Sequence, residues 1–137
     1  MEQLARSLKS IQVGLVLQFL LGLALGTLAP YDATSNELPS PQHNVLLIAH
    51  IVVAFGLLIN AVLIMVRATK QPGRRWTVIG WAGLGSVIVA LAGGVLTITT
   101  VWSEFFTFVM GLGFIVALVI YAYALTSARS ALPRSTK

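Results

Sequence analysis

Long apolar stretches alternate with short polar segments along the whole chain. Four such stretches cover residues 10–30, 44–66, 77–100 and 105–128, and each matches the roughly 20 residues that a helix needs to cross the hydrocarbon core of a bilayer. The segments between them are too short to fold by themselves. The pattern therefore predicts an all-α integral membrane protein, a single domain over residues 1–137 in which four transmembrane helices form a bundle of two helical hairpins.

The amino-acid composition agrees with this fold and excludes several kinds of functional site. Of the 137 residues, 57% are hydrophobic and 9% are charged, whereas a soluble domain carries about 25% charged residues. Cysteine is absent, which excludes disulfides and thiolate ligands. The net charge of +5 is not concentrated in a nucleic-acid-binding motif, so we expect the chain to meet the lipid bilayer and not nucleic acid.

The basic residues all belong to one side of the predicted bundle. They lie before the first apolar stretch, between the second and third, and after the fourth, at Arg6, Lys9, Arg67, Lys70, Arg74, Arg75, Arg129, Arg134 and Lys137. Because cytoplasmic segments carry the excess of lysine and arginine, both termini are predicted to be cytoplasmic in a multi-pass protein of the cell membrane, with Asp32, Glu37 and Glu104 outside. A cleaved signal peptide over residues 1–29 is the competing interpretation, but the first stretch is longer than a typical signal sequence.

The two hairpins resemble each other weakly in sequence. Residues 23–28 match residues 91–96 at four of six positions. The second and fourth stretches then align so that His50 falls opposite Val109 or Met110. Since leucine, alanine and glycine recur in any membrane helix, the sequence leaves open whether the hairpin is duplicated.

Small residues recur at four-residue spacing in three of the four stretches. Apolar side chains gain little by leaving lipid, so membrane helices associate where small residues let two backbones approach. We therefore expect close helix packing within the bundle along these ridges, or alternatively a face for a second copy of the chain. The ridges are Gly22 and Gly26, then Ala82, Ser86, Ala90 and Gly94, then Gly113 and Ala117.

His50 is the candidate metal ligand inside the membrane. It lies about six residues into the second stretch, hence ~9 Å below the outer boundary, and a neutral imidazole binds haem iron, zinc or copper. Met110 enters the fourth stretch at about the same depth, and a thioether is an axial haem ligand in some cytochromes. With Gly93, Gly94 and Gly113 near that level, these residues are predicted to line one cofactor pocket.

Other interpretations of the same residues stay open. His43, at the interface, is an alternative partner of His50 in binding the metal. His50 can instead form a hydrogen bond to a neighbouring helix through Gln18, Thr97 or a main-chain carbonyl. Met110 can simply pack between helices, as methionine commonly does.

The pattern resembles one four-helix half of the haem A synthase family. The matching stretches are residues 18–22, with Gln18 followed by Phe-Leu-Leu-Gly, and Ala49-His50 followed by Ala54. The resemblance implies that His50 is the second-helix haem ligand and that the cofactor is haem b; members of the family oxidise haem O. The fourth stretch departs from the family, because it has no histidine where members carry one and only Met110 or Val109 lies nearby.

These features predict a small membrane haem-binding protein, similar to a b-type cytochrome, that holds haem near the outer leaflet. It would serve respiratory electron transfer or haem handling, exchanging electrons with quinone or a larger respiratory enzyme. The alternative is a non-catalytic accessory subunit or assembly factor that docks on other membrane subunits. No hydrolase, phosphate-loop or dinucleotide motif is present, no catalytic residue is predicted, and the pattern favours a protein that is not an enzyme.

Overall fold

The computed structural model describes residues 1–28, 40–100 and 103–131. Within these residues the chain is helical and contains no strand, and each helix is long and apolar enough to cross a membrane. The four predicted apolar stretches are therefore confirmed as helices. Asp32 and Glu37 lie outside the described residues. The helices are α1 (Glu2–Leu28), α2 (Pro41–Thr69), α3 (Arg74–Thr99) and α4 (Ser103–Ser130).

Local signals explain where two of the helices begin. The Ser40 hydroxyl accepts a hydrogen bond of 3.1 Å from the backbone N–H of His43, and Pro41 follows at the first helical position, where its missing N–H costs nothing. Gly73 precedes α3 with a φ of 98°, a conformation that only glycine adopts without strain. It thereby turns the chain sharply from α2 into α3.

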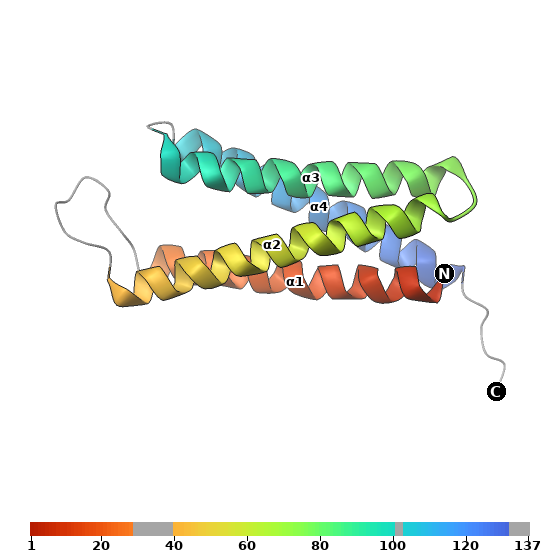
Figure 1. Ribbon diagram of the computed structural model, residues 1–137, viewed down its shortest axis with the longest axis horizontal. Helices are drawn as coiled ribbons and strands as arrows, with labels where there is room; N and C mark the ends of the chain where they lie inside the picture. Colours follow the sequence, from red (N-terminus) through yellow and green to blue (C-terminus); the bar gives the residue numbers. More distant parts are fainter. Residues whose placement is uncertain (29–39, 101–102, 132–137) are drawn as a thin grey trace.

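The helices form a ring in which each contacts two neighbours. The contacting pairs are α1 with α2, α2 with α3, α3 with α4, and α4 with α1, and in the described residues neither diagonal pair makes contact. Figure 1 shows α2 and α3 close together at the end where the N-terminus lies and diverging toward the other end. We call the first the basic end, since it holds the Lys70–Gly73 turn and the ends of α1 and α4, and the second the loop end.

The buried core lies between the middle of the bundle and the basic end. Apart from Gly93 and Gly113, every buried residue of the described ranges falls in that part of its helix. At the loop end, by contrast, large side chains such as Phe19, Phe55 and Phe108 are more than half exposed, as expected of surfaces that face lipid. The buried residues of the core are Leu4, Ser7, Leu8, Ile11, Leu15, Leu57, Ala61, Ile64, Ala68, Trp76, Ile79, Gly80, Gly83, Leu84, Val87, Ala117, Tyr121, Ala124 and Ala128.

The burial pattern relates the two hairpins. The buried positions of α2 recur 60 residues later in α4, where Leu57, Ala61, Ile64 and Ala68 correspond to Ala117, Tyr121, Ala124 and Ala128. All five buried positions of α1 recur 72 residues later in α3. This register pairs His50 with Met110, one of the two expected alignments. It differs by one helical turn from the letter match of residues 23–28 with 91–96, because runs of leucine, alanine and glycine can slide by a turn and still agree.

Candidate functional site

His50 lies in the loop-end half of α2 and faces α1. Its Nε2 is 2.8 Å from Nε2 of Gln18, so one of the two interpretations left open by the sequence, a hydrogen bond to a neighbouring helix through Gln18, is what the structure shows. The partner explains the position: Gln18 is a polar residue in the middle of an apolar helix, where an amide gains most by bonding across to another helix.

The pair leaves two buried polar atoms without a partner in the described residues. These are Nδ1 of His50 and Oε1 of Gln18. Gly22 makes this arrangement possible, because a Cβ at Gly22 would lie only 3.3 Å from Cε1 of the imidazole. In an apolar surrounding an unsatisfied polar atom costs free energy. The His50–Gln18 pair therefore has hydrogen-bonding capacity to spare, as does the buried hydroxyl of Tyr121 at the basic end.

Met110 lies in the other hairpin and packs on α3. A Cβ at Gly94 would lie 3.2 Å from its sulfur, and a Cβ at Gly93 would lie 2.7 Å from its backbone nitrogen. Gly113 contacts α3 just as closely, since its Cβ would lie 2.8 Å from the backbone nitrogen of Ala90. These glycines bring the backbones of α3 and α4 together and leave no slot between them for a flat cofactor.

The predicted pocket of His50, Met110 and the three glycines is therefore not assembled in the structure. Met110 lies with Gly93, Gly94 and Gly113, whereas His50 lies on a helix that does not contact α4 in the described ranges. The two residues occupy equivalent positions of the two hairpins, since His50 rests on Gly22 as Met110 rests on Gly94. The sequence predicts His50 and Met110 at the same depth because they are equivalent positions of two similar hairpins, and not because they line one site.

His43 does not join His50 at one metal. It lies in the first turn of α2, seven residues before His50, which separates the two α-carbons by roughly 10 Å along the helix. Among the described residues no group of three or more histidine, aspartate or glutamate side chains is close enough to hold a metal ion.

The small-residue ridges mostly pack within the chain. Ser86, Ala90 and Gly94 of α3 face α4 around Gly113 and Met110. Gly26 differs, because a Cβ added there would meet nothing within 4 Å, and Ala82 is exposed. The predicted homo-oligomer face through Gly22 and Gly26 or through α3 thus keeps only Gly26 and Ala82 as open positions.

Two polar contacts at the basic end were not anticipated from the sequence. Arg67 of α2 donates a hydrogen bond to the buried Ser7 of α1, and Arg75 of α3 donates one to Ser127 of α4. Each hydrogen bond joins the two helices of one hairpin at the basic end. A serine within three residues of the boundary of an apolar stretch, with an arginine at the same level of the neighbouring helix, is the signal that could have identified them.

His50 supplies an imidazole, a ligand type that binds haem iron. The ring itself occupies the space beside Gly22, and the unpartnered atoms of the His50–Gln18 pair have capacity for further polar contacts. Met110 is not placed as a second axial ligand in this structure, because its sulfur packs on α3, where a Cβ at Gly94 would lie 3.2 Å from it. Comparison of the chain with models of protein families, with curated proteins and with solved structures found no match.

Proposed function

We propose that this chain is a membrane protein that binds haem b through His50, in the half of the bilayer reached by the loop end. The observation that carries the proposal is the hydrogen-bonded His50–Gln18 pair between α2 and α1, in which each residue has a buried atom without a partner in the described residues. When bound, haem supplies one-electron redox chemistry. His50, Gln18 and Gly22 would provide the protein's part of that chemistry.

His50 would ligate through Nε2, the ring atom that now faces Gln18. Nδ1, which faces α1 beside Gly22, would then carry the proton and fix the orientation of the ring. Gln18 would give up its bond to Nε2 and turn its amide toward the polar edge of the ligand. Gln18 thus competes with the iron, which gives the proposal a test with a definite sign.

Haem titration of the purified full chain in detergent tests the proposal. We expect a Soret band at stoichiometric haem, its loss in His50→Ala, and no change in His43→Ala, the matched histidine seven residues away. Gln18→Ala should raise haem affinity, because it frees Nε2. The proposal fails if the wild-type chain binds no haem, or if His50→Ala, folded by circular dichroism, keeps the same spectrum.

The orientation is part of the same proposal. We propose that the basic end is cytoplasmic, so that both termini lie inside and the His50 site lies toward the outer leaflet of the cell membrane, because the described lysines and arginines all lie at that end. A cysteine introduced at exposed Arg74 should react with an impermeant thiol reagent only after the membrane is opened. Labelling of intact cells would reverse the assignment.

A second candidate function is that of an accessory subunit of a larger membrane complex. It is favoured by the open position at Gly26 and by the exposed Phe19 and Phe55 on the loop-end half of the first hairpin. Purification in a mild detergent from native membranes should then retain a stoichiometric partner. Gly26→Leu should release that partner, and Gly56→Leu, which also meets no neighbour in this chain, should not. A chain that purifies alone and monomeric contradicts this function.

A further inference from the structure

The groove between α1 and α4 at the basic end has more cationic side chains than carboxylates to pair with them. It is a shallow, open groove of about 270 Å³, and it is lined by Glu2, Ala5, Arg6, Lys9, Leu125 and Arg129. Three of these side chains are cations and one is a carboxylate. Neither Lys9 nor Arg129 has an ion pair or side-chain hydrogen bond within the part of the chain that the structure describes.

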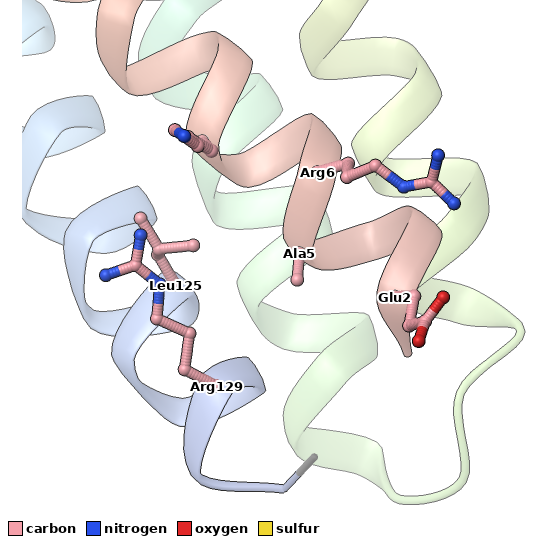
Figure 2. A pocket seen from close by; sticks show the side chains of 6 residues that line it. Glu2, Ala5, Arg6, Leu125 and Arg129 are labelled. Carbon is pink, nitrogen blue, oxygen red and sulfur yellow. The ribbon is translucent and has the colours of Figure 1, made fainter. Parts of the chain in front are cut away.

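The groove has an apolar floor and a basic rim. Figure 2 shows the guanidinium of Arg129 beside Leu125 on α4, with Ala5 of α1 facing the same space, while Glu2 and Arg6 lie on the other side of α1. Ala5 and Leu125 pack against the buried core of the bundle. The carboxylate of Glu2 thus does not neutralise Arg129 across the groove.

The level of the groove along the helices is that of lipid headgroups. Lys9 directly precedes the first apolar stretch, and Val13, one turn further into the membrane on the same face, is 63% exposed. The seam above the groove is closed by Gln12, whose amide donates a hydrogen bond of 3.2 Å to the carbonyl of Leu118. An amphipathic ligand here would place its charge at Lys9 and Arg129 and its chains along exposed apolar side chains.

We propose that this groove binds an anionic phospholipid, with the phosphate between Lys9 and Arg129 and the acyl chains against the outer surface of α1 and α4. A second groove at the same end, of about 470 Å³ between α1 and α2, is less suited, because its Arg67 already donates to Ser7. The charge excess, the apolar floor and the depth together favour a lipid over a soluble metabolite.

Native mass spectrometry of the full chain in detergent tests the proposal, with a short-chain phosphatidylglycerol and a phosphatidylcholine of equal chain length as probes. We expect the anionic lipid to bind more tightly, and the double variant Lys9→Ala with Arg129→Ala to weaken its binding roughly 25-fold, since each cation near an anionic headgroup contributes about a fivefold factor. The swap Lys9→Arg with Arg129→Lys keeps both charges and should keep the binding.

A matched double variant, Lys70→Ala with Arg74→Ala, removes the same charge at the turn between α2 and α3 and should leave binding within about twofold. The proposal is overturned if both double variants weaken binding equally, or if the zwitterionic lipid binds as tightly. It is also overturned if millimolar inorganic phosphate displaces the lipid, which would identify a site for a free anion. If circular dichroism shows that the Lys9 and Arg129 double variant is unfolded, Lys9→Gln alone should give roughly a fivefold loss.

Discussion

Replacement of Gly93 by alanine tests whether the glycines of α3 hold two backbones together or line a ligand pocket. A Cβ at Gly93 would lie 2.7 Å from the backbone nitrogen of Met110, 3.0 Å from its Cα and 3.0 Å from the carbonyl oxygen of Phe106. All three are backbone atoms of α4, so no side-chain rotation relieves the contact. The two helices must separate locally by about 0.7 Å before the closest pair reaches ordinary van der Waals distance.

The cost follows from that separation. A gap of roughly 0.5–1 Å forfeits a quarter to a half of the dispersion energy between the atoms that it parts, and forced overpacking of this kind costs about 1–3 kcal/mol. Alanine recovers up to about 1 kcal/mol through its higher helix propensity. We expect Gly93→Ala to destabilise the bundle by about 1–2 kcal/mol.

Alanine substitutions at two other glycines serve as comparisons for Gly93→Ala. Gly94→Ala should cost less, because its Cβ meets only the flexible end of Met110 at 3.2 Å, and Gly111→Ala should cost nothing, because its Cβ meets nothing within 4 Å. Unfolding of the three variants in mixtures of a denaturing and a mild detergent, followed by circular dichroism, gives the order directly. If Gly93→Ala is as stable as Gly111→Ala and instead lowers haem binding, the close packing described for α3 and α4 is wrong.

Three other variants probe polar groups and the relation between the hairpins. Ser7→Ala removes the acceptor of Arg67 and should lower the free energy of unfolding by about 1 kcal/mol, measured in the same detergent titration; an unchanged midpoint would show the bond to be incidental. Tyr121→Phe should be neutral or stabilise by about 1 kcal/mol, since the buried hydroxyl has no partner in the described residues, and a destabilised variant would reveal a partner. Ala90→Gln with Met110→His builds the second hairpin's counterpart of the Gln18–His50 pair. The double variant should be more stable than the two single variants predict by addition, because the introduced amide and imidazole can form a hydrogen bond, and additive effects in the same detergent titration would contradict the equivalence.

The sequence predicted the helices well and the site poorly, for different physical reasons. Length and apolar character determine that a segment spans a bilayer, so four helices followed from four stretches. Their ends were less predictable: α1 begins at Glu2, eight residues before the apolar stretch, because a helix satisfies its own backbone hydrogen bonds in water as well as in lipid. Hydrophobicity marks where lipid begins and not where a helix does.

Depth along a helix does not give direction around it. The sequence predicts His50 and Met110 at one level, but in the structure His50 faces α1 and Met110 faces α3. Nearly every position of these helices is apolar, so the sequence carries little periodic contrast to show which face is internal. The contact that the structure adds, Gln18 with His50, is between the few polar side chains of these stretches, and pairing such residues first is the better rule for a membrane helix.

Because the buried core is restricted to one half of the bundle, few buried side chains join the loop-end halves of the two hairpins. From the middle of the bundle to the loop end each helix runs for roughly 20 Å, and a rotation of about 10° between the hairpins moves their tips by about 3 Å at that radius. A rotation about Leu15 and Leu57 would separate no fully buried side chains on the loop-end side, since Gly93 and Gly113 belong to one hairpin and would move together. It would part the stacked rings of Phe19 and Phe114, which join α1 to α4 there. His50 lies on the arm that would move, so a small change at the basic end would be larger in the spacing between its hairpin and the other.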